Sequence, residues 1–119
     1  MKNIFLSIVL LLLLITTTAM AHPPGEVTAQ FDLEKSILSV EVAHNVGGGS
    51  NSHYIDEVII SLNGKEVIVQ KTTRQISDTQ TFLYFMPAVE AGDKIGIVAV
   101  CNVGGQGNIE ITVKDKEEN

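Results

Sequence analysis

The sequence has no tryptophan, a single cysteine and few aromatic residues, which make up 5% of its 119 residues. One cysteine excludes a disulfide within the chain, so the packed core has to stabilise the fold without a cross-link. Basic residues are also scarce, eight against 14 acidic ones, and form no cluster that would bind a phosphate backbone. The sequence therefore argues against a nucleic-acid partner, and its length fits one small domain.

A long hydrophobic run is present at the start of the chain. Lys2 precedes an apolar stretch over residues 4–15, and Ala19-Met20-Ala21 follows it. A basic start, an apolar run of about 7–15 residues and an A-x-A site are the marks of a secretory signal peptide. We expect residues 1–21 to be a signal peptide whose removal leaves His22 as the mature N-terminus. A retained anchor, which needs about 20 apolar residues, is the alternative.

Export would place the domain of residues 22–119 in the periplasm or outside the cell, with no membrane association after cleavage. Because Lys2 is lost, seven basic residues then face 14 acidic ones, a net charge of −7. Cys101 has three open explanations: a buried small side chain, an intermolecular disulfide or a metal ligand. A homo-oligomer is left open.

Apolar residues after position 22 alternate with polar ones, the period-two pattern of β-strands. Seven short segments carry it, around residues 27–31, 38–42, 58–62, 67–69, 82–86, 95–100 and 109–113. Asn63-Gly64 is typical of a type I′ hairpin turn, which predicts that segments 54–62 and 65–71 pair. No helical stripe is present. This pattern predicts an all-β, immunoglobulin-like antiparallel β-sandwich of about seven strands.

The histidines and the cysteine lie at the ends of these segments. His22 starts the mature chain, His44 and His53 flank a glycine-rich loop, and Cys101 ends a strand before a second such loop. Imidazole and thiolate are ligands of iron, copper and zinc, and strand ends can converge at one rim of a sandwich. The spacing matches no short zinc motif, so surface histidines and a buried cysteine are the alternative reading.

Two strings suggest a family. His53-Tyr54-Ile55, followed by Val58-Ile59-Ile60 and the turn Asn63-Gly64-Lys65, and later Cys101-Asn102-Val103-Gly104-Gly105, resemble the iron-binding domain of superoxide reductases and desulfoferrodoxins in wording and in order. That resemblance covers most of residues 22–113. It implies an immunoglobulin-like sandwich with a mononuclear iron held by four histidines and an axial cysteine thiolate.

The resemblance implies that His22, His44 and His53 are metal ligands and that Cys101 is the axial ligand. Two positions depart from the family pattern. Asn45 follows His44 where the family has proline, and Gly104 stands where its fourth histidine is expected. The glutamate-lysine pair that precedes the first histidine in the family is also missing, because Met20-Ala21 occupies those positions.

We therefore predict an exported metal-binding domain, with iron as the expected metal and an incomplete ligand set that leaves superoxide turnover in doubt. Catalytic residues are not assigned, and an electron donor would be required if the protein is redox active. One alternative is a non-catalytic β-sandwich binding module. Another is an exported copper-binding protein whose His22 chelates the ion through its ring and its free α-amino group; zinc is a further candidate metal.

Overall fold

The structure is a computed structural model and describes residues 22–116. The predicted signal peptide, residues 1–21, lies outside this range. Seven strands follow one another: β1 (Val27–Asp32), β2 (Ile37–Ala43), β3 (Ile55–Leu62), β4 (Lys65–Lys71), β5 (Thr79–Phe85), β6 (Lys94–Cys101) and β7 (Gln106–Thr112). Within residues 22–116 no helix is long and apolar enough to span a membrane. The prediction of an all-β chain is confirmed.

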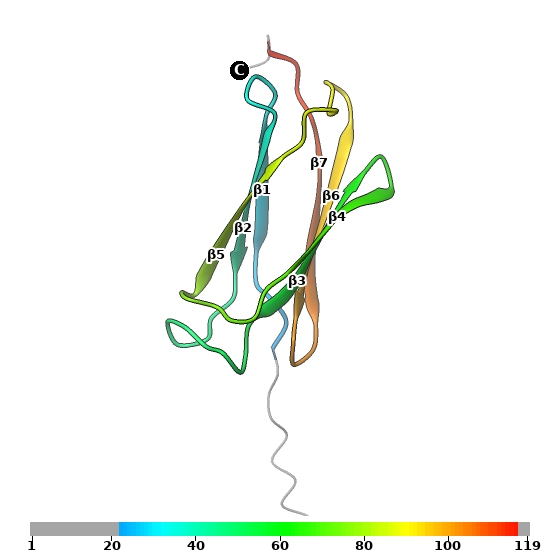
Figure 1. Ribbon diagram of the computed structural model, residues 1–119. Helices are drawn as coiled ribbons and strands as arrows, with labels where there is room; N and C mark the ends of the chain where they lie inside the picture. The colour runs from blue at the N-terminus through cyan, green and yellow to red at the C-terminus, as the bar shows by residue number, and fades with distance from the viewer. Residues whose placement is uncertain (1–21, 117–119) are drawn as a thin grey trace, which may run out of the picture.

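The strands form two antiparallel sheets that pack face to face (Figure 1). One sheet has the order β1-β2-β5 and the other β4-β3-β6-β7. In an immunoglobulin sandwich the first, second and fifth strands share one sheet, and the third, sixth and seventh share the other. The predicted β-sandwich is therefore confirmed, with β4 added beside β3.

The predicted hairpin at Asn63-Gly64 is also confirmed. Asn63 has a φ of 50° and Gly64 a φ of 83°, the two positive values that a type I′ turn requires. β3 and β4 pair through this turn, with a register shift between Ile60 and Ser61. The turn lies at the end of the sandwich away from the histidines.

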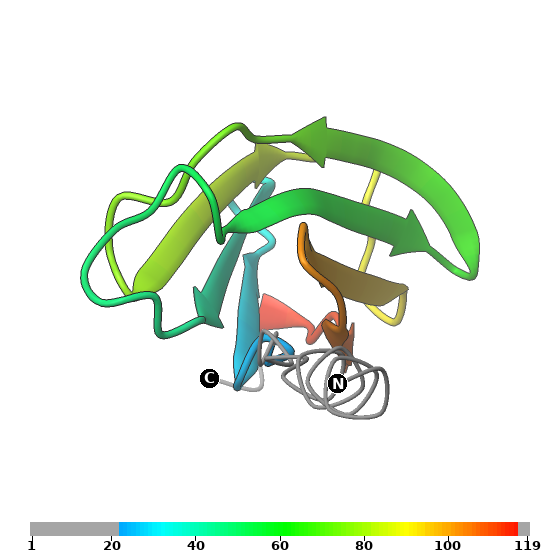
Figure 2. The ribbon, with the colours of Figure 1, turned by 90° about the horizontal axis from the view of Figure 1, so that it is seen from below.

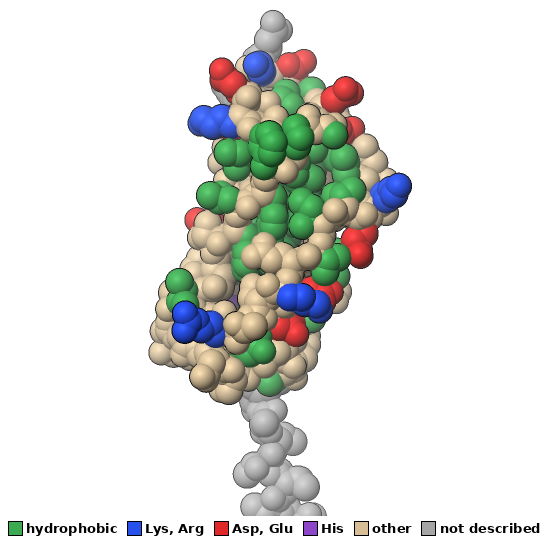
Figure 3. Space-filling model, in the orientation of Figure 1, with side chains coloured by type: hydrophobic (Ala, Val, Ile, Leu, Met, Phe, Trp, Pro, Cys, Tyr) green, Lys and Arg blue, Asp and Glu red, His purple; other side chains and the backbone are tan. Residues whose placement is uncertain are grey.

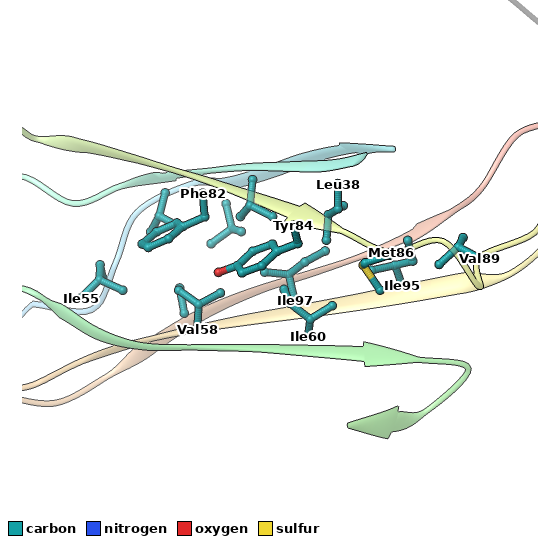
Figure 4. Packing of buried hydrophobic residues seen from close by; sticks show 14 of the residues in the cluster. Leu38, Ile55, Val58, Ile60, Phe82, Tyr84, Met86, Val89, Ile95 and Ile97 are labelled. Atoms are coloured by element: carbon teal, nitrogen blue, oxygen red, sulfur yellow. The ribbon is translucent and has the colours of Figure 1, made fainter. Parts of the chain in front are cut away.

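The core lies between the sheets and is built from the alternate residues that the period-two pattern selects. Phe82 and Tyr84 of β5 stack with ring centroids 6.4 Å apart and face Val58 and Ile60 of the other sheet (Figure 4). The Tyr84 hydroxyl is buried without a hydrogen-bond partner, and burial raises the pKa of Tyr84 to about 12. Apolar residues of both sheets therefore share one hydrophobic core.

The two long sides of the sandwich differ. On one side β1 contacts β7 and closes the gap between the sheets, whereas β5 and β4 are the free edges on the other side. Figure 3 shows a band of hydrophobic side chains there, and Leu83 and Phe85 of β5 are largely exposed. The expectation of a homo-oligomer stays a prediction.

Candidate metal centre

The three histidines come together at one end of the sandwich, although different segments of the chain carry them. His22 precedes β1, His44 follows β2, and His53 precedes β3. Ring centroids lie 4.6 Å apart for His44 and His53, 4.9 Å for His22 and His53, and 5.1 Å for His22 and His44. Of the four residues predicted to converge at one rim, these three do so. We call this end the histidine end; it is the lower end in Figure 1 and faces the viewer in Figure 2.

The spacing suits a single metal ion. One ring nitrogen from each histidine lies within 4.8 Å of the other two. Nitrogen ligands at about 2.0–2.1 Å from one ion are at most about 4.2 Å apart. Small movements of the rings would therefore bring all three nitrogens to bonding distance.

His44 is the fixed member of the cluster. His44 is 1% exposed, and its backbone N–H donates to the Asp78 carbonyl oxygen at 2.8 Å. Its ring Nδ1 lies 2.8 Å from Oε1 of Gln75, which is buried as well. The ring therefore has little freedom to turn.

Gln75 also determines which nitrogen of His44 carries the proton. The Gln75 Nε2 donates to the carbonyl oxygens of His44 and Ser77 at 2.6 and 2.7 Å, which identifies the other amide atom as the oxygen. That oxygen accepts the Ile55 N–H at 3.3 Å, so His44 Nδ1 must be a donor to it. In the neutral ring the Nε2 of His44 is therefore the unprotonated acceptor, and it is buried and has no hydrogen-bond partner. Such an outer hydrogen bond is the usual way a ligating histidine is oriented.

His53 is held by its neighbours in the loop and by Asn102. Its backbone N–H donates to the Ser50 hydroxyl oxygen at 2.9 Å. The Asn102 side chain donates to the Ser52 carbonyl oxygen and accepts the Tyr54 N–H, both at 2.9 Å, so it fixes the backbone on either side of His53. His53 Nε2 is buried and without a partner, as in His44.

The electrostatics of the cluster favour a neutral imidazole at His53. Burial lowers the pKa of His53, and repulsion from the nearby His44 and His22 lowers this pKa further. A metal ion binds the neutral ring, so the lowered pKa leaves His53 ready to ligate at neutral pH.

His22 reaches the cluster because the segment ahead of β1 continues the sheet. The Gly25 N–H donates to the Ala43 carbonyl oxygen at 2.7 Å, and the Ala43 N–H donates to the Glu26 carbonyl oxygen at 2.9 Å. We call residues 22–26 the N-terminal strap. These bonds to the residue before His44 carry His22, which is exposed, beside the buried His44 and the partly buried His53.

Two glycines, one in the turn between β6 and β7 and one near the start of β7, leave room for the strap. A Cβ on Gly105 would stand 2.7 Å from the Pro23 Cβ and 2.8 Å from its Cα, and one on Gly107 would stand 2.9 Å from a Val27 methyl carbon. Only a residue without a side chain fits at such distances. The second glycine-rich loop thus contributes space, and not a ligand, to the histidine end.

Cys101 is the last residue of β6, and Gly104 lies in the turn that follows it. The role of Cys101 as an axial metal ligand stays a prediction. Among the residues the structure describes, the group of close ligand atoms holds the three histidines and does not include Cys101. Cys101 is 3% exposed, pairs with Ile55 across the sheet, and its Sγ lies 4.0 Å from the Asn102 Oδ1. Gly104 is exposed in the adjoining turn with a φ of 126° and open space where a side chain would project.

Sequence reasoning missed the residues that orient the ligands. Gln75 lies 31 positions after His44 and 22 after His53, in a segment with no periodic pattern, so no local signal identifies it. Asn102 did leave a signal, because it belongs to the Cys101-Asn102 string that accompanies His53-Tyr54-Ile55. The structure gives that pairing a physical reason, since Asn102 bonds to both neighbours of His53.

Comparisons with known proteins establish a fold and no function. No protein-family description matches the chain, and no curated protein is similar to it. A solved structure of a hypothetical protein from Pyrococcus horikoshii is similar, with a TM-score of 0.51 and 13% identity over 78% of this chain and 90% of that one. At this identity the likeness concerns the β-sandwich alone.

Proposed function

We propose that this protein binds a divalent transition-metal ion through the ring nitrogens of His22, His44 and His53. The observation that carries the proposal is the buried, unprotonated Nε2 of His44, whose proton position is set by Gln75 and which has no hydrogen-bond partner. A buried polar atom without a partner costs about 1–3 kcal/mol. Two such nitrogens, on His44 and His53, face a third histidine, and a metal ion would satisfy both.

The donor set favours copper or zinc over iron. Three imidazoles without a carboxylate suit zinc and copper, and both bind nitrogen ligands more tightly than ferrous iron. The axial thiolate of the superoxide-reductase pattern would have to come from Cys101, which lies outside the cluster of close ligand atoms. We infer that the protein is a metal-binding module, with superoxide reduction as the second candidate carried by the sequence resemblance.

Bound metal would also link the two sheets. His44 follows β2 in one sheet and His53 precedes β3 in the other. An ion held by both would join them at the end where the chain has its longest loop, residues 44–54. In a domain with no internal disulfide, metal binding should therefore raise the free energy of unfolding.

Elemental analysis and calorimetric titration of the protein test the proposal. We expect one equivalent of copper or zinc per chain and a higher unfolding temperature with metal than after chelation. His44→Ala should abolish binding, whereas Asn108→Ala, at an exposed position of β7, should bind like the parent protein. Failure of all three metals, copper, zinc and iron, to bind would overturn the proposal. Iron with a thiolate charge-transfer band that Cys101→Ser removes would instead favour the superoxide-reductase candidate.

A further inference from the structure

We propose that removal of residues 1–21 completes the site, because the free α-amino group of His22 then becomes a fourth nitrogen ligand and makes the site selective for Cu²⁺. This inference rests on the proposed function. Two independent observations meet at one residue. The sequence predicts a signal-peptidase site, Ala19-Met20-Ala21, directly before His22, and the structure places His22 in the three-histidine cluster.

The chemistry of the first residue suits chelation. An α-amino group and the Nδ1 of the same histidine can bind one metal ion in a six-membered ring. In the structure His22 Nδ1 lies 3.2 Å from the Pro23 carbonyl oxygen, an exposed contact between neighbours that a metal bond can replace. Ligation releases the proton of the amino group, as metal binding does for any protonated ligand.

Pro23 limits how the terminus can bind copper. At many protein termini Cu²⁺ can displace the proton of the second residue's backbone amide and bind that nitrogen, but proline has no N–H. The terminus of this chain therefore offers its amino group and its own ring, and the remaining nitrogens must come from His44 and His53. Pro23 also restricts the backbone, and its contact with Gly105 fixes the strap over the body of the domain.

Four nitrogens distinguish copper from zinc. Cu²⁺ stands at the peak of the divalent affinity series and prefers a tetragonal set of nitrogen or oxygen ligands. One amine and three imidazoles supply four nitrogens, whereas an uncleaved chain supplies three. Cleavage would therefore couple copper binding to export, because the precursor lacks the fourth ligand.

The test compares two forms of the same domain. The full chain is exported from its own leader, and intact mass identifies the mature terminus. A second form keeps residues 16–21 ahead of His22, which moves the free amino group six residues away from the site. Cu²⁺ affinity is measured by competition with a chelator, and electron paramagnetic resonance counts the nitrogen ligands.

We expect the mature product to begin at His22 and to bind Cu²⁺ at least about tenfold more tightly than the extended form, since even residues that only support a metal ligand change affinity by about 10–100-fold. We also expect four nitrogen ligands in the mature form and three in the extended form. Equal affinities with three nitrogens in both forms would overturn the inference and leave the three-histidine site intact. A mature terminus elsewhere than His22 would overturn it as well. Absence of metal binding in both forms would instead refute the proposed function.

Discussion

The two ends of the sandwich use the same kind of side chain for different purposes. At the end away from the histidines, Asn63 joins the β3–β4 turn to the start of β6: it donates to Asp93 and accepts the Lys94 N–H, each at 2.9 Å, in full contact with solvent. At the histidine end, Gln75 also bridges three segments, but it is buried, and one of its partners is a histidine ring.

The difference is one of solvent. At the far end the bridging Asn63 is exposed, so water can replace each hydrogen bond that it makes. The histidine end has the longest connection between described strands, residues 44–54, and buries the Gln75 side chain that joins it to residues 72–78. Burial increases the free energy that is lost with each hydrogen bond, and it holds the histidine ring in one orientation. A metal site needs a fixed ligand orientation, whereas a turn does not.

The largest expected effect comes from removing the buried bridge. Gln75→Ala should lower the free energy of unfolding by about 3 kcal/mol or more, because it leaves several buried polar groups without a hydrogen-bond partner, at a cost of about 1–3 kcal/mol each. Asn63→Gly, which removes the far bridge and keeps the positive φ, should cost about 1 kcal/mol or less. Urea denaturation of both variants gives the comparison, and similar losses would contradict the contrast between the ends.

Gln75→Glu separates orientation from stability. The carboxylate can still accept the His44 Nδ1 proton but cannot donate to the two carbonyl oxygens that Gln75 Nε2 contacts. We expect a folded but less stable protein in which His44 Nε2 stays unprotonated. Nitrogen-15 chemical shifts of the His44 ring report this directly, and a protonated Nε2 would show that Gln75 does not set the tautomer.

A smaller effect follows from the contact between the strap and the turn. Gly105→Ala should push Pro23 away and weaken metal binding by about tenfold or more, on the scale of other supporting contacts at metal sites. Gly104→Ala is the matched control, since it shares the strain of a positive φ but meets open space. Titration calorimetry measures both, and equal affinities would show that the strap does not position His22.

A still smaller effect is expected in the pH dependence of the free energy of unfolding of the metal-free protein. The pKa of His53 is lowered in the folded state, so between that value and its unfolded pKa of about 6.5 the unfolded chain binds more protons. Stability is therefore full above about pH 6.5 and falls as the pH drops through this window. Unfolding titrations from pH 8 to 5 should show the loss, and His53→Gln should reduce it. An unchanged profile in the variant would contradict the assignment.

The smallest effects concern exposed carboxylates at the two ends. Hydrogen bonds from the backbone N–H groups of Gly48 and Val46 lower the pKa of Asp78, and the Asn63 side chain and the Glu90 N–H lower that of Asp93. Each contributes stability above the usual aspartate pKa that is lost as the pH falls below it. Asp78→Asn and Asp93→Asn should both flatten the acid side of the stability profile slightly. Only Asp78→Asn should also weaken metal binding, because the loop it holds follows His44.

Local sequence patterns predicted much of the fold. Alternation of apolar residues identified all seven strands, and Asn63-Gly64 identified the hairpin, because both depend on residues adjacent in the chain. The histidines were identified from their places at strand ends. Cys101 has the same sequence signal as they have, yet it lies outside the group of close ligand atoms, and no pattern distinguishes an inward from an outward side chain at the last residue of a strand.

The sequence by itself determined an all-β chain, its turns, an acidic surface and three histidines placed at segment ends. The tertiary structure alone decided that these histidines meet and that Gln75 gives His44 a free Nε2. It also decided that the glycines at 105 and 107 make room for the strap. The physical reason is distance along the chain: strand formation depends on neighbours, whereas the site depends on contacts between residues up to 82 positions apart, which exist only once both sheets have packed.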